Sequence, residues 1–276
     1  MPFVPVTVGL LPARAAARSM ASISRLRATF CEGLAMFRYS RLLVLLPLLA
    51  FTAACDAGDG HDKVLGSVHV AAGQSPSDAS TVNGAIRIDP NAKSGNDSTV
   101  NGSIELGDNA SADTLSTVNG SITLGAHASV QAASTVNGSI RLGNGARITK
   151  DIESVNGGLS LSQGADVAGR ATNVNGHISI DGAHVGGGIE TSNGDIDITG
   201  ASRVDGGILV RKTNNNGWFH FGIERTTHVV IGPGATVNGT LKFEREVKLY
   251  VSDRAHVGPI VGATPVKFSG DQPPST

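Results

Sequence analysis

Apolar and polar residues alternate in short stretches that recur along most of the chain. In Ile104-Glu105-Leu106, for example, one polar residue separates two aliphatic residues. A period of two is typical of a β-strand with one buried face. The first apolar position of the copies holds Ile86, Ile104, Ile122, Ile140, Leu159, Ile178 and Ile196, and the second holds Ile88, Leu106, Leu124, Leu142, Leu161, Ile180 and Ile198. We therefore predict two columns of buried aliphatic side chains.

An Asn-Gly pair precedes each of these stretches at a nearly constant interval of about 18 residues, which indicates a repeat architecture. The pairs are Asn83-Gly84, Asn101-Gly102, Asn119-Gly120, Asn137-Gly138, Asn156-Gly157, Asn175-Gly176 and Asn193-Gly194. Asn-Gly tolerates positive φ, so we expect a corner at each pair. We also expect stacked asparagine amides to bond one another; a row of ligand-binding asparagines is the alternative.

A second pattern, Ala-x-Val-x-Gly-x-Ile, runs through the later copies, as in the stretch from Ala183 to Ile189. Together with the Ser-Thr-Val residues before each Asn-Gly pair, it predicts three short strands per repeat. The expected fold is all-β: a single-stranded, three-sided β-solenoid (β-helix) with about 18 residues per coil, over residues 64–263.

Aromatic residues are absent from Asp56 to Gly217 and return at Trp218-Phe219-His220-Phe221, where the period also breaks. We predict a hairpin insertion or a cap near residues 211–230. Its four residues Trp218, Phe219, His220 and Phe221 either pack on the solenoid or contact a ligand or partner. We expect one longer strand from Phe243 to Val251 and a disordered tail over residues 264–276.

The N-terminal part has the layout of a secretory signal, with a basic start followed by the apolar run Leu42 to Ala50. The run ends in Thr52-Ala53-Ala54-Cys55, which resembles a bacterial lipobox. The resemblance implies a signal peptide over residues 36–54, lipid such as palmitate on Cys55, and a linker over 55–63. Residues 1–35 are then a mis-assigned or upstream segment; an organelle transit peptide is the alternative. We expect a lipid-anchored protein of the bacterial cell envelope, on either membrane.

Cleavage before Cys55 changes the charge and the cysteine count. The whole chain has 22 basic and 23 acidic side chains, and residues 1–54 contain six arginines and one glutamate. The remainder has 16 basic and 22 acidic side chains, a net charge of −6. An acidic body is not typical of a nucleic-acid-binding protein. The two cysteines are Cys31 and Cys55, so the mature chain has no pair for a disulfide.

The sequence has no nucleophile elbow, P-loop, dinucleotide fingerprint or metalloprotease motif. The strongest candidate for a catalytic groove combines Glu190, Asp195 and Asp197 with Arg203 and Arg211 nearby. Isolated surface charges are the simpler interpretation. We therefore predict no enzymatic activity, no cofactor and no metal site, with calcium between coils as an open alternative.

The Asn-Gly-Ser-Ile repeats resemble bacterial adhesin-type β-solenoid domains, and the Ala-x-Val-x-Gly-x-Ile pattern resembles bactofilins, which form polymers. The first resemblance implies an envelope protein with a structural or adhesive surface, whose partner is a protein or a glycan. The second implies a filament subunit that associates through its solenoid ends. A polysaccharide-binding or polysaccharide-cleaving β-helix is a third alternative.

Overall fold

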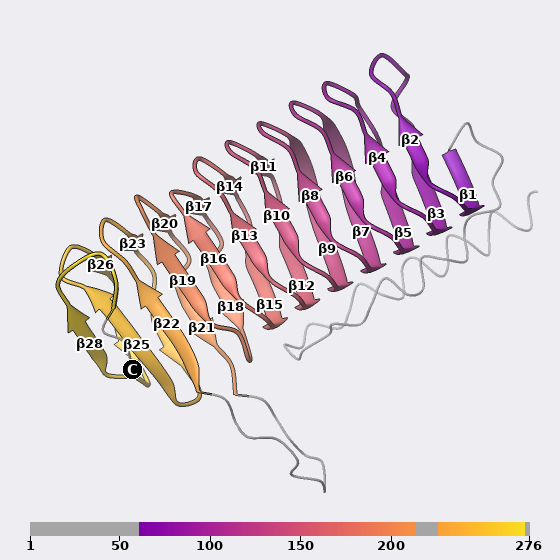
Figure 1. Cartoon of the computed structure of the whole chain (residues 1–276). Helices are drawn as coiled ribbons and strands as arrows, with labels where there is room; N and C mark the ends of the chain where they lie inside the picture. The colour runs from indigo at the N-terminus through magenta and orange to yellow at the C-terminus, as the bar shows by residue number, and fades with distance from the viewer. Residues whose placement is uncertain (1–60, 213–225, 274–276) are drawn as a thin grey trace, which may run out of the picture. The chain divides into compact units, whose positions relative to one another are not determined.

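The computed structural model describes residues 61–212 and 226–273, which form a parallel β-solenoid without any helix (Figure 1). These residues belong to one compact unit, residues 55–276. Strands of successive coils pair in register, as in Ile86↔Ile104 and Ile104↔Ile122. The predicted all-β solenoid is confirmed, and its coils have the length that the spacing of the Asn-Gly pairs predicts.

The strands form three ladders of parallel pairs. The first ladder contains β1 (His61–Leu65), β3 (Ala79–Asn83), β5 (Asp97–Asn101), β7 (Ser111–Asn119), β9 (Ser129–Asn137), β12 (Ile152–Asn156), β15 (Ala171–Asn175), β18 (Ile189–Thr191), β21 (Ile208–Val210), β24 (Leu241–Phe243) and β27 (Ile260–Val261). The second ladder contains β2 (Val68–Val70), β4 (Ile86–Ile88), β6 (Ile104–Leu106), β8 (Ile122–Leu124), β10 (Ile140–Leu142), β13 (Leu159–Leu161), β16 (Ile178–Asp181), β19 (Ile196–Thr199), β22 (Thr227–Ile231), β25 (Val247–Ser252) and β28 (Pro265–Phe268).

The third ladder is shorter and starts from the first residues of the two long strands β7 and β9. It continues through β11 (Arg147–Ile148), β14 (Asp166–Val167), β17 (His184–Val185), β20 (Arg203–Val204), β23 (Thr236–Val237) and β26 (His256–Val257). From β10 onward, each coil therefore contributes one short strand to each ladder.

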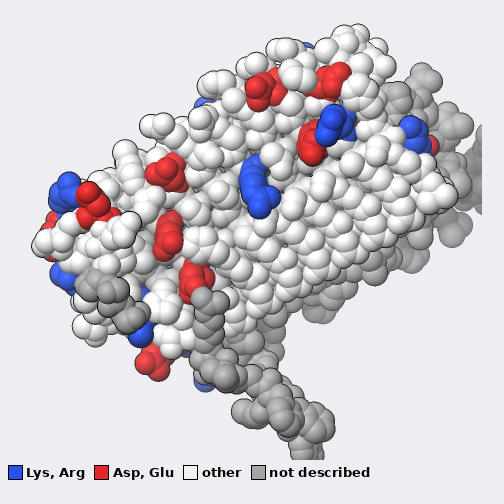
Figure 2. All heavy atoms as spheres, viewed as in Figure 1, with Lys and Arg blue, Asp and Glu red and all other residues white. Residues whose placement is uncertain are grey.

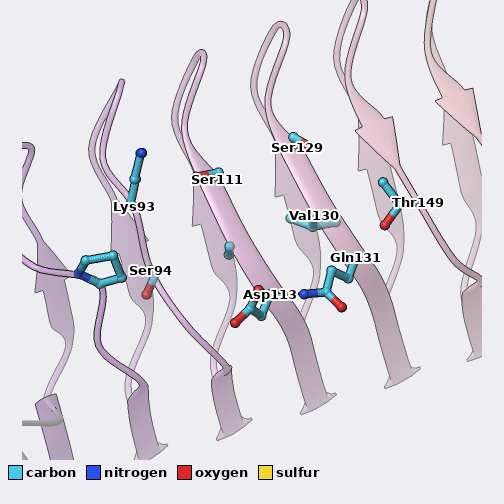
Figure 3. Close-up of a pocket in the computed structure, with 10 residues that line it drawn as sticks. Lys93, Ser94, Ser111, Asp113, Ser129, Val130, Gln131 and Thr149 are labelled. Atoms are coloured by element: carbon cyan, nitrogen blue, oxygen red, sulfur yellow. Dashed lines mark hydrogen bonds between the residues drawn. The ribbon is translucent and has the colours of Figure 1, made fainter.

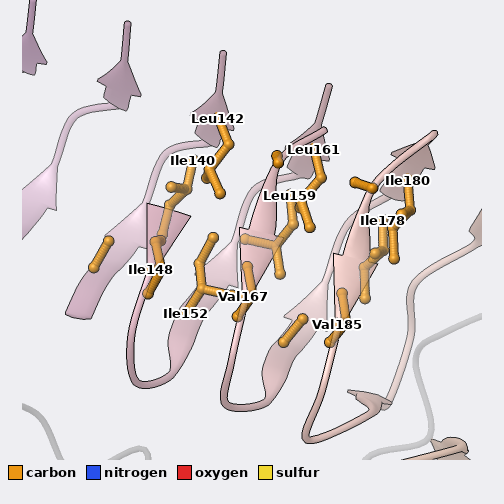
Figure 4. Close-up of a cluster of buried hydrophobic side chains, with 14 of the residues drawn as sticks. Ile140, Leu142, Ile148, Ile152, Leu159, Leu161, Val167, Ile178, Ile180 and Val185 are labelled. Atoms are coloured by element: carbon orange, nitrogen blue, oxygen red, sulfur yellow. The ribbon is translucent and has the colours of Figure 1, made fainter. Parts of the chain in front are cut away.

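The interior is filled by aliphatic columns that run along the stack. Both predicted columns are buried, with Ile104, Ile122 and Ile140 fully inaccessible. Figure 4 shows three successive coils, where Ile140, Leu159 and Ile178 stack behind one another. Each side chain packs against its equivalent in the next coil, which explains why the same residue type recurs at each position.

One buried column is polar and ties neighbouring coils together. Thr99, in β5, donates from its hydroxyl to the carbonyl oxygen of Gly84 at 2.9 Å, and Thr117 does the same to Gly102. Four further members, Thr81, Thr135, Ser154 and Asn173, donate to Gly66, Gly120, Gly138 and Gly157. The next member, Thr191, is buried without a hydrogen-bond partner among the described residues. A buried carbonyl without a partner is costly, so this column explains the Thr of the Ser-Thr-Val-Asn-Gly motif.

The Asn-Gly corner forms as predicted, but the expected reason for its glycine is wrong in most coils. A Cβ on Gly102 would lie 1.9 Å from the carbonyl oxygen of Gly84 in the preceding coil. The glycine is therefore required by the close approach of two backbones. Positive φ occurs instead at another corner, in Asn91, Asn109 and His127, where the later coils have Gly145 and Gly164.

The period breaks between β21 and β22, as the sequence indicates. Val229 pairs with Ile196, a step of 33 positions, whereas the ordinary step from Asn137 to Asn156 is 19 positions. The coil that joins β21 to β22 therefore contains an insertion. The ladders then continue through β25 and β28, so the regular stacking resumes after the insertion (Figure 1).

Two expectations for the C-terminal part are wrong. The stretch from Phe243 to Val251 is not one strand, because β24 ends at Phe243 and β25 starts at Val247. The disordered tail expected from residue 264 contains β28, which pairs with β25 and buries Phe268. The Pro-Val-Lys-Phe sequence ends in an aromatic ring that is buried, and this apolar burial stabilises the strand.

Candidate functional site

The predicted lipidation and contact residues lie outside the described residues. They are Cys55 and the aromatic segment Trp218, Phe219, His220 and Phe221. The functional predictions for these five residues stay predictions. The described chain does show the predicted turn residues and the exposed faces of the coils.

The seven corner asparagines form one continuous hydrogen-bonded ladder, as predicted. From Asn101 onward, each Nδ2 donates to the Oδ1 of the asparagine one coil earlier, from 2.8 Å for Asn101 to Asn83 through 3.0 Å for Asn193 to Asn175. The intervening bonds are 2.9 to 3.0 Å long. Arg245 donates to Asn193 Oδ1 and to the Ser192 carbonyl, so a guanidinium caps the acceptor end. The amide bonds therefore tie successive coils together at this corner.

Beside this ladder, the outward side of the first ladder carries two regular columns, which we call the hydroxyl–valine face. One column is valine in six consecutive coils: Val82, Val100, Val118, Val136, Val155 and Val174. The other holds Ser80, Ser98, Ser116, Ser134, Glu153 and Thr172. These side chains are partly exposed, except that Glu153 is exposed. One residue of the twelve is charged.

Charged side chains elsewhere pair along or between coils. Figure 2 shows the charged side chains of the visible face scattered singly or in small groups, with a broad white area between and below them. Arg87 and Glu105 pair at 2.7 Å on adjacent strands of the second ladder. Exposed pairs of this kind contribute little to stability.

His184 forms the most connected cluster, on the third ladder. Its Nδ1 lies 2.7 Å from Asp166 and its Nε2 lies 3.0 Å from Asp205. The hydrogen bonds to Asp166 and Asp205 raise the pKa of His184. The bond with His184, with help from Asn238 and Arg203, lowers the pKa of Asp205 to about 2. This arrangement joins three coils by charge.

The acidic residues proposed as the strongest catalytic candidates do not meet in one groove. Glu190 lies on the first ladder between Arg170, at 3.1 Å, and Arg211. Asp197 lies on the second ladder, 3.3 Å from His177, and Asp195 accepts a hydrogen bond from the His228 amide. Arg203 pairs with Asp205 on the third ladder. Each carboxylate has its own cationic or amide partner, which matches the interpretation as surface charges.

One carboxyl points into the core. Asp97 occupies the column of Ala79 and Leu115 and is 1% exposed. Ser94 donates to its Oδ1 at 2.6 Å, whereas Oδ2 has no hydrogen-bond partner among the described residues. Burial raises the pKa of Asp97 to about 7.

A shallow hollow of about 270 Å³ lies beside Ser94, and Figure 3 shows its lining. Gln131 donates to Asp113 at 2.7 Å across it, and Lys150 donates to Gln131. The amide of Gln131 is thus already used by groups of the protein itself.

Among the described residues, no group of three or more His, Cys, Asp or Glu could hold a metal ion. In the same part of the chain, no helix is long and apolar enough to cross a membrane. Comparison of the chain with protein-family models, with curated proteins and with solved structures gives no match. The adhesin-type and bactofilin resemblances therefore stay hypotheses, and a function for the protein has to be inferred from the geometry of its coils.

Sequence reasoning missed the hydroxyl–valine face and the buried Asp97. The signal for the face was present, because Ser-Thr-Val-Asn-Gly recurs unchanged in four consecutive coils. The motif could be interpreted as an exposed face only once the Thr side chain was known to point into the interior, because Ser and Val then point outward.

Proposed function

We propose that the protein is a non-enzymatic, lipid-anchored component of the bacterial cell envelope whose rigid solenoid serves as a scaffold or adhesive surface. The observation that carries the proposal is the uninterrupted pairing of the coils, from β1 to β27 in the first ladder and from β2 to β28 in the second, with backbone, asparagine and threonine bonds all running between coils. Eleven strands in one ladder, at about 4.8 Å per coil, give a rod of roughly 50 Å.

The short connection to the expected anchor supports this role. β1 starts at His61, and the residue expected to carry lipid is Cys55. Only residues 56–60 lie between them, so the connection spans at most about 22 Å. A rod held this closely would display its faces near the membrane.

Metabolic labelling with radioactive palmitate tests the anchor. We expect the wild-type chain to be labelled, Cys55→Ala to lose the label, and Cys31→Ala to keep it as the matched control. Fractionation should place the wild-type protein with membranes. An unlabelled wild-type chain in the soluble fraction would overturn the proposal.

End-to-end association, as in a filament, is the second candidate function. The exposed large aliphatic residues of the described chain are Val64 and Leu65 in β1 and Val261 and Val266 in β27 and β28. They lie at opposite ends of the ladders, where strand edges are unpaired. Electron microscopy should show filaments that Leu65→Lys shortens; only single particles at high concentration would exclude this function.

A further inference from the structure

The hydroxyl–valine face is unusual for an exposed sheet surface. Solvent-facing strands normally carry interspersed charges of both signs, which keep sheets apart. Here the valine column is unbroken for six coils, and Glu153 is the single charge among the twelve residues. Apart from Glu153, the side chains are β-branched or short, so the surface of this face is nearly flat and regular.

The spacing of this face limits what can match it. Its columns repeat once per coil, because Ser98 pairs with Ser116 and Ser116 with Ser134. Neighbouring parallel strands lie about 4.8 Å apart, so a complementary partner must present contacts at the same interval. A second parallel sheet meets this requirement because its strands have the same spacing. Identical short side chains from two such sheets interdigitate well.

We propose that the hydroxyl–valine face binds the same face of a second copy of this chain. The two copies pack sheet against sheet, with the valines of each between the columns of the other. A two-fold arrangement makes the surface self-complementary, and residues near the centre, such as Val118, lie close to the axis. Few like charges oppose the contact, since one residue in twelve is ionised.

The size of the face indicates a weak pair. The face is six coils long, at about 4.8 Å per coil, and one strand of about five residues wide, which gives an area of roughly 500 Å² per partner. The total buried area would be roughly 1,000 Å², below the usual total of about 1,600 Å² for a stable interface. The inference therefore rests on the proposed membrane anchor, because copies held in one membrane meet at a raised effective concentration. The pairing itself is a property of the face and can be measured without lipid.

Glu153 gives a variant that should strengthen the pair. Partial desolvation by its neighbours, followed by the charges of Asp151 and Glu190, already raises the pKa of this carboxyl although its side chain still contacts water. Covering it with a second copy removes more water from an ionised group, which opposes association. We expect Glu153→Gln to dimerise at least several-fold more tightly at neutral pH, an outcome that misfolding would not produce.

Sedimentation velocity over a range of concentrations tests the proposal, with the full chain carrying Cys55→Ala so that lipid plays no part. We expect a monomer–dimer equilibrium that Val118→Lys abolishes. Thr123→Lys adds the same charge in the same coil on the exposed side of the second ladder, and should leave the dimer intact. Mixing Val118→Lys with Val118→Glu should restore a dimer.

In cells, the wild-type lipid anchor is retained and cysteine cross-linking reports the same contact. Ser116→Cys should give a covalent dimer and Thr123→Cys should not. A wild-type chain that stays monomeric at all concentrations, or a dimer that survives Val118→Lys, would overturn the inference. So would a monomer that binds soluble glycans through Val118, because the face would then have a different partner. A dimer without palmitate labelling would refute the anchor alone.

Discussion

The glycine of each corner is required by space at the level of single atoms. Gly157 and Gly158 are neighbours in one corner but meet different surroundings. A Cβ on Gly157 would lie 1.9 Å from the Gly138 carbonyl oxygen, whereas one on Gly158 would lie 3.0 Å from the His177 oxygen. Position 158 corresponds to Ser139 of the preceding coil. Only the first glycine is therefore irreplaceable.

We predict that Gly157→Ala lowers the free energy of unfolding by about 1–3 kcal/mol or more, because two coils must separate to admit the methyl group. Gly158→Ala should change it by less than about 1 kcal/mol, in either direction. Urea unfolding followed by circular dichroism measures both. Equal effects of the two substitutions would contradict the close-approach explanation.

The buried Asp97 makes stability depend on pH. Its pKa is about 7 in the folded chain, against the ordinary value of 3.8. Below pH 3.8 the carboxyl is protonated in both states. Between pH 4 and 7 only the unfolded chain ionises, so stability falls as the pH rises; above pH 7 the loss is complete. The total loss in the free energy of unfolding is of order 4 kcal/mol at most.

We predict that the double substitution Ser94→Ala and Asp97→Leu removes most of this pH dependence. The equivalent positions one coil later already hold Ala112 and Leu115. The double variant should be more stable than the wild type at pH 8. Thermal unfolding from pH 4 to 8 measures the effect, and Asp271→Asn, at an exposed carboxyl, is the control. A wild-type stability that is flat or rising between pH 4 and 7 would contradict this account of Asp97.

At the scale of the element, one coil is held to the next by a hydroxyl inside and an amide at the corner. Thr117 faces inward and donates to the Gly102 carbonyl, and Thr123 of the same coil faces outward. Val has nearly the shape of Thr but cannot donate. The two threonines therefore separate the hydrogen bond from the effect of side-chain shape.

We predict that Thr117→Val lowers the free energy of unfolding by about 1–3 kcal/mol, because the Gly102 carbonyl is left buried without a partner. Thr123→Val should stay within about 0.5 kcal/mol of the wild type. Chemical denaturation of both variants is the measurement. If Thr117→Val is neutral, water reaches the corner carbonyls and the interior polar column is not essential.

The coil was predictable from sequence because equivalent positions of successive repeats have the same packing and strand pairing. The period fixed the pairing of Ile104 with Ile122, and the Asn-Gly positions fixed the amide ladder. The glycine requirement was not predictable, because it arises from the distance between coils rather than from local φ. Asp97 was also missed, because a single carboxyl in an alternating stretch looks exposed until the register places it beside Leu115.

For the whole molecule, the insertion between β21 and β22 is the main departure from regular stacking. The ladders resume beyond it, with Val229 paired to Ile196. Because each coil contacts mainly its neighbours, stability in such a stack is roughly a sum of local terms.

We predict that replacing residues 213–225 with a short Gly-Ser connection leaves the β-sheet circular dichroism spectrum unchanged and shifts the melting temperature by only a few degrees. The variant also tests the aromatic segment, since any binding carried by Trp218 would disappear while the stack remains. Loss of the cooperative transition would instead show that the insertion is needed for the last coils.

The near-identity of the coils containing β3, β5, β7 and β9 has a consequence for how the chain finds its structure. A coil can skip one repeat and pair with the next but one, and most of its contacts will be satisfied equally well. Such slipped states compete with the native one during folding. What distinguishes them is the set of residues that occur once, including the Arg87–Glu105 pair and Ser94 with Asp97. These irregular residues tell otherwise interchangeable coils apart, at some cost to stability.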